Sequence, residues 1–240
     1  MRECRRRAAS RLAPRLRGWP GVSVRTTAAK RAPRPRTALV MIDFQRDFCE
    51  RGGYADHAGG IAWVRPILPK ARRLLDAARR ARLLVVHTRE GYAPDLSDCD
   101  PAKLARSRRG GCEIGSPGPL GRLLIRGEHG HGIVDDLAPR RGEIVIDKST
   151  YGAFCRTSLE ALLRARGVAR LAIAGVTADV CVHTTLREAT DRGFACDYVR
   201  DAISTFDAEI RRACERMVAV EGGIWGRVVT VAKLEKEWLG

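Results

Sequence analysis

The segment GVTADVCVHTT, residues 175–185, places a cysteine where a short apolar run gives way to a helical pattern. The preceding residues 170–174 (RLAIA) are typical of a buried parallel strand, and residues 180–192 carry polar and apolar side chains at helical spacing. We therefore expect Cys181 in the first turn of a helix, where free N–H groups and the helix dipole favour a thiolate. A buried structural cysteine is the alternative, because free cysteine is among the most buried residue types.

Charged residues follow two other apolar runs. The apolar run of residues 38–42 is followed directly by Asp43, and the run of residues 143–146 is followed within two positions by Lys148. In open α/β sheets, ligands bind beyond the carboxyl ends of the strands, so we expect Asp43, Lys148 and Cys181 to meet in one crevice. A structural ion pair at the sheet edge is the alternative for Asp43 and Lys148.

Strand patterns alternate with helical patterns along the chain. We expect strands near residues 37–42, 83–88, 143–147, 170–175, 195–200 and 226–231, and helices near 61–81, 157–166, 180–192 and 207–219. This order predicts an α/β chain with a three-layer αβα, Rossmann-like fold and a six-stranded, mainly parallel sheet. Residues 90–141 are too many for an ordinary connection, so they are expected to form a cap over the crevice or an intersubunit arm.

Basic residues are concentrated at the N-terminus. Residues 1–36 hold twelve Lys or Arg and one acid, which gives +11 of the formal net charge of +16 and leaves +5 for the rest. This Arg- and Pro-rich extension is expected to be largely disordered, with an organelle transit peptide or a misassigned start codon as alternatives. Residues 37–240 are expected to form one domain. They show no basic stripe interleaved with aromatic residues, so no specific nucleic-acid partner is expected.

The eight cysteines form no CxxC pair and no zinc-like spacing, so reduced thiols are expected. No dinucleotide fingerprint follows the first strand and no Walker A segment occurs, so we expect no nucleotide and no other cofactor. The chain also shows no secretory leader and no apolar run of roughly 18 residues. We therefore expect a cytoplasmic protein without a membrane partner.

Three segments together resemble the signature segments of the isochorismatase-like cysteine hydrolases. They are TALVMIDFQRDF (37–48), DKSTYGAF (147–154) and GVTADVCVHTTLREATDRGF (175–194). The resemblance extends over about residues 37–230 and implies a catalytic triad of Asp43, Lys148 and Cys181. It also implies a cis peptide bond before Thr177, which directs the backbone amides of Thr177 and Cys181 as an oxyanion hole.

The same resemblance bears on metal binding and assembly. Nicotinamidase relatives carry an Asp-x-His metal site, whereas Asp56 and His57 are adjacent in this chain, so no metal is expected. Relatives commonly assemble as dimers or tetramers, which implies a homodimer or a homotetramer here.

Further segments are similar to the biuret hydrolase branch of the family, which implies a small ureido substrate. They are residues 49–59, 87–98, 107–137 and 221–226. Where this branch has a glutamine, the chain has Glu221, and where it can carry a second lysine, the chain has Tyr151. A carboxylate accepts hydrogen bonds but does not donate them, so Glu221 would favour an NH-rich end of a substrate. Phe48 is expected to wall the pocket, and Arg89 is a further substrate-binding candidate with a surface salt bridge as its alternative.

The implied reaction is metal-independent amide hydrolysis. Asp43 takes the thiol proton of Cys181, Lys148 stabilises the thiolate, and the thiolate attacks a ureido carbonyl. Ammonia then leaves, and water hydrolyses the acyl thioester. Ureidoacrylate, triuret, an N-carbamoyl amine or nicotinamide are alternative substrates. A carboxylated substrate would need a cationic anchor, for which Arg89 and residues 106–109 are candidates. A non-catalytic binding or assembly subunit is the alternative from another class.

Overall fold

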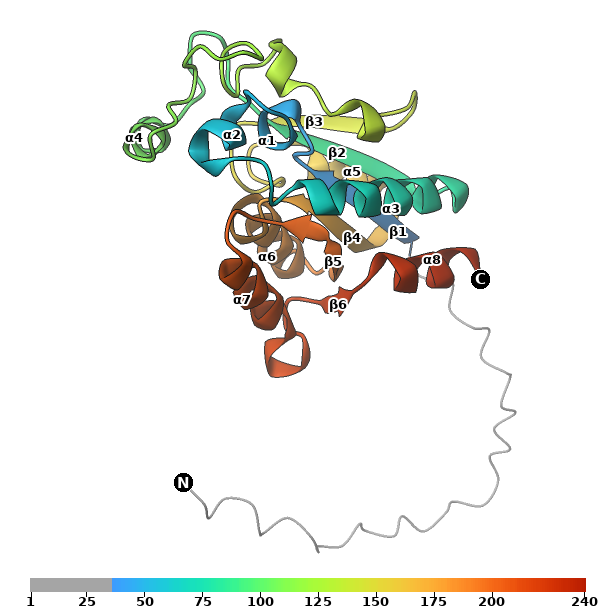
Figure 1. Cartoon of the computed structure of the whole chain (residues 1–240). Coiled ribbons are helices and arrows are strands. Elements are labelled where there is room, and N and C mark those ends of the chain that lie inside the picture. The colour runs from blue at the N-terminus through green and yellow to red at the C-terminus, as the bar shows by residue number, and fades with distance from the viewer. Residues whose placement is uncertain (1–35) are drawn as a thin grey trace, which may run out of the picture. The chain divides into compact units, whose positions relative to one another are not determined.

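The computed structural model describes residues 36–240, and its centre is one six-stranded sheet (Figure 1). The strands are β1 (Arg36–Ile42), β2 (Leu84–Glu90), β3 (Ile144–Lys148), β4 (Val168–Val176), β5 (Ala195–Ser204) and β6 (Arg227–Val229). They lie in the order β3-β2-β1-β4-β5-β6, and every neighbouring pair is parallel. All carboxyl ends therefore meet at one edge of the sheet. The strand order reverses between β1 and β4, which is where open α/β sheets bind ligands.

Helices cover both faces of this sheet. The longer ones are α3 (Leu68–Arg80), α5 (Leu159–Ala165), α6 (His183–Asp191), α7 (Ala208–Ala219) and α8 (Val231–Leu239). In β1, Leu39 and Met41 belong to the core shared with α3 and α8, whereas Val40 and Ile42 belong to the core shared with α5, α6 and α7. Strands buried on both faces read as continuous apolar runs, which explains why β1 shows no polar alternation. The predicted three-layer αβα fold is confirmed.

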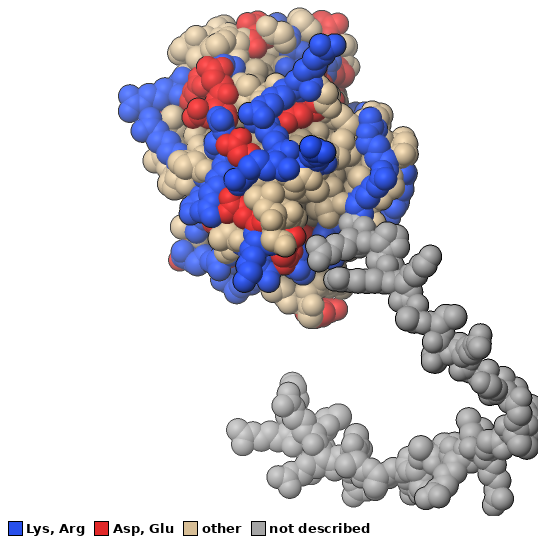
Figure 2. All heavy atoms as spheres, turned by 90° about the vertical axis from the view of Figure 1, so that its right-hand side faces the viewer, with Lys and Arg blue, Asp and Glu red and all other residues tan. Residues whose placement is uncertain are grey.

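Charges of both signs cover the described part of the chain. On the face shown in Figure 2, Lys and Arg side chains are interspersed with Asp and Glu. Several form ion pairs, such as Arg79 with Glu143 at 2.7 Å and Arg126 with Asp98 at 2.7 Å. The predicted basic extension, residues 1–36, lies outside the described residues except for Arg36, which begins β1. Among residues 36–240, no helix is both long enough and apolar enough to cross a bilayer.

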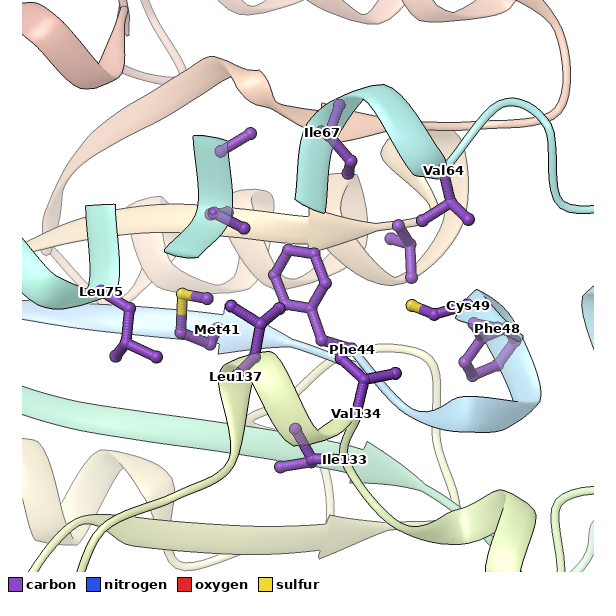
Figure 3. Packing of buried hydrophobic residues seen from close by; sticks show 14 of the residues in the cluster. Met41, Phe44, Phe48, Cys49, Val64, Ile67, Leu75, Ile133, Val134 and Leu137 are labelled. Carbon is purple, nitrogen blue, oxygen red and sulfur yellow. The ribbon is translucent and has the colours of Figure 1, made fainter. Parts of the chain in front are cut away.

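The chain leaving β1 is anchored by buried apolar side chains. Phe44 is 1% exposed and lies beside Val134 and Leu137, with Met41 further along the same cluster (Figure 3). The backbone adds support, because the Val134 N–H donates to the Phe44 carbonyl. This packing fixes the position of Asp43, which lies between Ile42 and Phe44.

Several element boundaries differ from the prediction. The helix expected over residues 61–81 is shorter, because Pro66 and Pro69 each occupy the first turn of a new helix, first the 3-10 turn Arg65–Ile67 and then α3. Helix α8 was not predicted. The predicted cap, residues 90–141, contains α4 (Pro101–Arg109) and two 3-10 turns. Two short helices, α1 (Arg46–Cys49) and α2 (Tyr54–Gly59), follow β1.

Candidate active site

Strands β1, β3 and β4 bring the predicted triad together at the carboxyl edge of the sheet, where β2 lies between β1 and β3. Asp43 follows β1, Lys148 is the last residue of β3, and Cys181 lies five residues beyond the end of β4. The Lys148 Nζ lies 2.8 Å from the Asp43 Oδ2 and 3.6 Å from the Cys181 Sγ. All three are buried, with 0%, 2% and 4% of Asp43, Lys148 and Cys181 exposed. The expected convergence of these residues is therefore present in the structure.

Asp43 is held in place from several sides. Its φ is +54°, its N–H donates to the Thr88 carbonyl at 3.2 Å, and its Oδ1 accepts from the Thr88 hydroxyl at 2.6 Å. Its Oδ2 pairs with Lys148 at 2.8 Å, although the angle falls outside ordinary hydrogen-bond geometry, so the contact is an ion pair. The same ammonium donates to the Thr150 carbonyl at 3.0 Å. The carboxylate is thus oriented before any substrate binds.

Cys181 lies in a π-helical turn, Ala178–Val182, rather than in the first turn of an α-helix, because α6 begins only at His183. The peptide bond between Val176 and Thr177 is cis, as the resemblance implied. Gly175 makes this path possible, since its φ is +142° and a Cβ there would lie 2.2 Å from the Ile42 carbonyl oxygen. Close contact between β4 and β1 therefore brings Cys181 next to Asp43.

Glu90, the last residue of β2, is a fourth buried charge in the site. Its Oε2 lies 3.2 Å from the Cys181 Sγ and 3.6 Å from the Lys148 Nζ. Its Oε1 accepts from the Tyr92 hydroxyl at 2.7 Å and lies 2.9 Å from the Lys103 Nζ of α4. Glu90 was not predicted as a site residue, because the strand was expected to end at residue 88. The sequence did contain a signal for it, because Glu90, like Asp43, is a carboxylate close to the carboxyl end of a predicted strand.

Burial opposes ionisation of Glu90, but the ammonium groups of Lys148 and Lys103 outweigh it and lower the pKa of Glu90 to about 2. Burial alone would lower the pKa of Lys148, but the Asp43 carboxylate and its other neighbours raise it above the ordinary value. Both residues are therefore charged at neutral pH.

The thiol behaves differently from its prediction. Burial raises the pKa of Cys181 well above its ordinary value, the single ammonium of Lys148 opposes this, and the carboxylates of Glu90 and Asp43 add to it. The expectation that its position would favour a thiolate is thus wrong for the resting site. Burial and the two nearby carboxylates favour the neutral thiol, and the turn that carries Cys181 is only five residues long. Cys181 rests as a thiol and requires a base.

A cavity of about 310 Å³ opens above the sulfur. Its wall includes Phe48, Tyr54, Glu90, Lys103, Arg106, Tyr151, Thr177, Cys181 and Phe206. Helix α4 supplies Lys103 and Arg106, so part of the long segment between β2 and β3 caps the crevice as predicted. Phe48 and Tyr151 line the cavity as expected for substrate-binding positions, and Thr177 lines it together with Cys181. Their roles in binding and catalysis stay predictions.

Two sequence-predicted residues do not reach this cavity. Arg89 pairs with Asp147 through two hydrogen bonds of 2.7 and 2.9 Å, so its alternative, a surface salt bridge, describes it. Glu221 is exposed in the turn between α7 and β6. Helix α7 carries the chain back to the amino end of β6, which is the sheet edge opposite the cavity. The prediction that Glu221 binds substrate is therefore wrong for a site built from one chain.

The model of the isochorismatase domain matches residues 37–231 of this chain. The chain belongs to the isochorismatase family. It is 33% identical to ureidoacrylate amidohydrolase RutB of Stutzerimonas stutzeri (strain A1501), over 68% of this chain and 65% of that relative. The match thus spans slightly less than two thirds of the relative's length.

Two solved structures share the fold of this isochorismatase-family chain. A cysteine hydrolase from Pseudomonas syringae pv. phaseolicola 1448A has a TM-score of 0.72 and 25% identity, covering 85% of this chain and 92% of that one. N-carbamoylsarcosine amidase from Thermoplasma acidophilum has a TM-score of 0.62 and 25% identity, covering 82% and 96%. The resemblance to the isochorismatase-like cysteine hydrolases is therefore confirmed.

Within the described part of this family member, one group of side chains has the donors of a metal site. Ligand atoms of Asp43, Glu90 and Cys181 lie within 4.8 Å of one another. The Lys148 ammonium already contacts all three, at 2.8, 3.6 and 3.6 Å. A metal ion would have to displace this buried cation, so these residues fit an ammonium better than a metal. The absence of a metal requirement stays a prediction.

Proposed function

We propose that the chain is a metal-independent cysteine amidohydrolase that cleaves a C–N bond of a small ureido compound and releases ammonia. One observation carries this proposal: the Cys181 sulfur lines a cavity while contacting the ammonium of a buried Lys148–Asp43 pair. This arrangement combines a nucleophile, a carboxylate base and a cation that stabilises negative charge on sulfur. A structural thiol would require neither the cavity nor the ion pair.

The proposed acylation begins with removal of the thiol proton. An Asp43 carboxylate oxygen lies within 4.8 Å of the sulfur, and the raised pKa of Cys181 makes a base necessary. Lys148 stays protonated and stabilises the thiolate as it forms. The sulfur then attacks the ureido carbonyl, and the backbone amides of Thr177 and Cys181 stabilise the oxyanion.

Collapse of the tetrahedral intermediate completes the first half-reaction. The C–N bond breaks as the nitrogen takes the proton held by Asp43, and ammonia leaves an acyl thioester on Cys181. Asp43, again a carboxylate, then accepts a proton from the attacking water. The same proton returns to the sulfur when the acid product leaves. Every proton that Asp43 accepts is thereby returned within one turnover.

Two candidates for the ureido substrate have separate support. The sequence resemblance to the biuret hydrolase branch supports biuret or a compound like it. Arg106 supports a second candidate, a carboxylated ureido compound such as ureidoacrylate. Its exposed guanidinium lines the cavity and donates to the Tyr151 hydroxyl at 3.3 Å, whereas Arg89, the other proposed anchor, is paired with Asp147. The relative named as a ureidoacrylate amidohydrolase supports the same candidate.

The test is ammonia release, without added metal, by the wild type and Cys181→Ala. The panel is biuret, triuret, ureidoacrylate, an N-carbamoyl amino acid and nicotinamide. We expect release from at least one ureido compound and a loss of at least about 1,000-fold in Cys181→Ala, because the nucleophile is removed. Release that persists in the variant would rule out the covalent mechanism. No release from any compound would favour the non-catalytic alternative.

A further inference from the structure

Glu90 is the carboxylate that faces the substrate, although it has no part in the predicted triad. Of the two carboxylates beside the sulfur, Glu90 lines the cavity, whereas Asp43 is 0% exposed and lies beneath it. The oxygens of Asp43 contact Thr88 and Lys148, which both lie on the side of the sheet strands. A substrate that reaches Cys181 therefore meets Glu90 first.

Three cationic or hydroxyl neighbours hold Glu90 as a fixed anion. Its Oε1 contacts the Tyr92 hydroxyl at 2.7 Å and the Lys103 ammonium at 2.9 Å. Its Oε2 lies 3.6 Å from Lys148 and accepts a hydrogen bond of 3.2 Å from the Cys181 thiol, a bond that is lost when the thiol gives up its proton. A carboxylate held in this way is a weak proton acceptor and a strong hydrogen-bond acceptor. The chemistry that suits it is binding of N–H donors.

The short distance between Glu90 Oε2 and the Cys181 sulfur would allow a substrate N–H to reach this carboxylate oxygen. Nucleophilic attack begins with the carbonyl carbon about 3 to 3.5 Å from the sulfur, and an amide C–N bond adds about 1.3 Å. If the carbonyl oxygen points towards the amides of Thr177 and Cys181, the amide nitrogen takes another position around the same carbon and can turn towards Glu90. Glu90 Oε2, at 3.2 Å from the sulfur, is within hydrogen-bond reach of that nitrogen.

We propose that Glu90 is the specificity-determining residue that accepts hydrogen bonds from the departing NH2 group of the ureido substrate. The thiol proton goes to Asp43, and Glu90 keeps its charge throughout. As the C–N bond breaks, the nitrogen gains a proton from Asp43 and becomes more positive, so its hydrogen bond to Glu90 strengthens. Primary amides are therefore favoured over esters, whose alkoxy oxygen would face the carboxylate without a proton to donate. This inference rests on the proposed amidohydrolase function.

The test compares each amide with its methyl ester. Biuret is paired with methyl allophanate, and ureidoacrylate with the analogue in which OCH3 replaces the terminal NH2. In Glu90→Gln, we expect kcat/KM for ammonia release to fall about 10- to 100-fold, because a hydrogen bond to a charged group is lost. Methanol release from the ester should stay constant or rise, since the glutamine amide can donate to the ester oxygen. The ratio of the two activities does not depend on how much protein folds.

Two further variants keep the result interpretable. Asp43→Asn should lower amide and ester hydrolysis together, because both need the same base. Glu90→Asp keeps the negative charge but, with a shorter side chain, moves it away from the sulfur. It should also lower the amide-to-ester ratio, and it replaces Glu90→Gln in the test if that variant does not fold. An equal loss of both activities in the Glu90 variants would overturn the inference and leave the proposed function intact. Failure of the wild type to release ammonia from these two amides and from the rest of the panel would overturn both.

A second readout separates a substrate contact from a base. The rate of Cys181 alkylation by iodoacetamide is measured against pH, with Cys181→Ala as the background for the other thiols. In Glu90→Gln, the profile should move to lower pH, because removing a neighbouring anion favours the thiolate. A shift to higher pH, or slower alkylation at neutral pH, would identify Glu90 as the base and overturn the inference.

Discussion

At the scale of single residues, the site is a neutral set of buried charges. Two carboxylates, Asp43 and Glu90, are matched by two ammonium groups, Lys148 and Lys103, and the sulfur of Cys181 lies among them. A buried charge without a partner is costly, whereas this arrangement pairs every one. Proton transfer from the thiol to Asp43 moves charge within the set without changing its total, so the nucleophile forms without bringing a net charge into the interior.

Three of these residues could be predicted because each lies shortly after an apolar run. Asp43 directly follows its run, Lys148 follows within two positions, and Cys181 follows a strand within a recognisable motif. Glu90 carries the same signal, but the polar residues around it made the strand look shorter than it is. Glu221 was misplaced because a local sequence pattern does not show at which edge of the sheet a loop lies. Side-chain contacts such as Lys103 with Glu90 depend on tertiary packing and leave no local signal.

Asp47 makes stability depend on pH. Burial raises the pKa of Asp47 to about 6, although hydrogen bonds from backbone amides, including that of Leu124 at 2.9 Å, oppose the rise. A folded-state pKa above the unfolded value of 3.8 means that the folded chain binds more protons between the two values. This contribution to the free energy of unfolding is full below pH 3.8 and is lost as pH rises through about 6.

Asp47→Asn should therefore abolish the loss of unfolding free energy that ionisation of Asp47 causes as pH rises. We expect the variant to gain unfolding free energy relative to the wild type between about pH 4 and pH 7, by up to about 2 kcal/mol, with little difference near pH 4. Urea denaturation at a series of pH values measures this difference. A gap between the two proteins that does not change with pH would contradict the assignment to Asp47.

At the scale of elements, the close contact between β4 and β1 positions the nucleophile. Two glycines with positive φ allow a matched comparison. Gly175 has φ +142°, and an added Cβ would lie 2.2 Å from the Ile42 carbonyl oxygen, whereas Gly193 has φ +78° and open space around it. An added methyl at Gly193 meets only backbone strain. The same methyl at Gly175 also pushes the two strands apart.

Gly193→Ala should cost about 1 to 2 kcal/mol of unfolding free energy and leave kcat/KM unchanged. Gly175→Ala should cost more, and the surviving folded protein should lose activity because Cys181 moves away from Asp43. Chemical denaturation and kcat/KM per folded molecule check both effects. Equal stability losses, or full activity in folded Gly175→Ala, would show that this strand contact does not position the sulfur.

Element order was more predictable than element boundaries. The alternation of apolar runs and helical patterns predicted all six strands, because strands of a parallel sheet are buried on both faces. Boundaries were less certain where proline divides a helical pattern, as at Pro66 and Pro69, and where a strand continues past its apolar centre, as β5 does to Ser204. Helix α8 was missed because the apolar signal of β6 was extended into it.

At the scale of the whole molecule, charge is divided unevenly along the chain. Residues 1–35 hold eleven Lys or Arg and one acid, so +10 of the net +16 lies before β1. The described part presents charges of both signs (Figure 2). We expect a chain of residues 36–240 to keep its melting temperature and kcat/KM, because every residue of the cavity lies within it.

The same truncation tests nucleic-acid binding. Any salt-sensitive binding of the full chain to DNA or RNA should disappear when residues 1–35 are removed. Such binding depends on clustered Lys and Arg side chains that release counterions from the phosphates, and these residues hold the cluster. A filter-binding titration at two salt concentrations checks this expectation. Undiminished affinity in the truncated chain would place a nucleic-acid surface on the folded part.

The expected homodimer or homotetramer requires a surface where copies of the chain contact each other. Helix α7 and the turn after it expose Ile210, Met217, Val220 and Ile224, each more than a third accessible. Exposed apolar side chains of this kind are what a contact between copies would cover.

Two parts of the chain meet in the wall of the cavity. The reacting groups are fixed by strand ends in the rigid centre of the sheet, whereas Lys103 and Arg106 come from α4, a nine-residue helix in the connection between β2 and β3. Lys103 is buried against Glu90 and Leu104 packs on the core, so these two positions tie the helix to the sheet. Arg106 is exposed, and a change of this side chain alters the wall of the cavity while the strand ends keep the reacting groups in place.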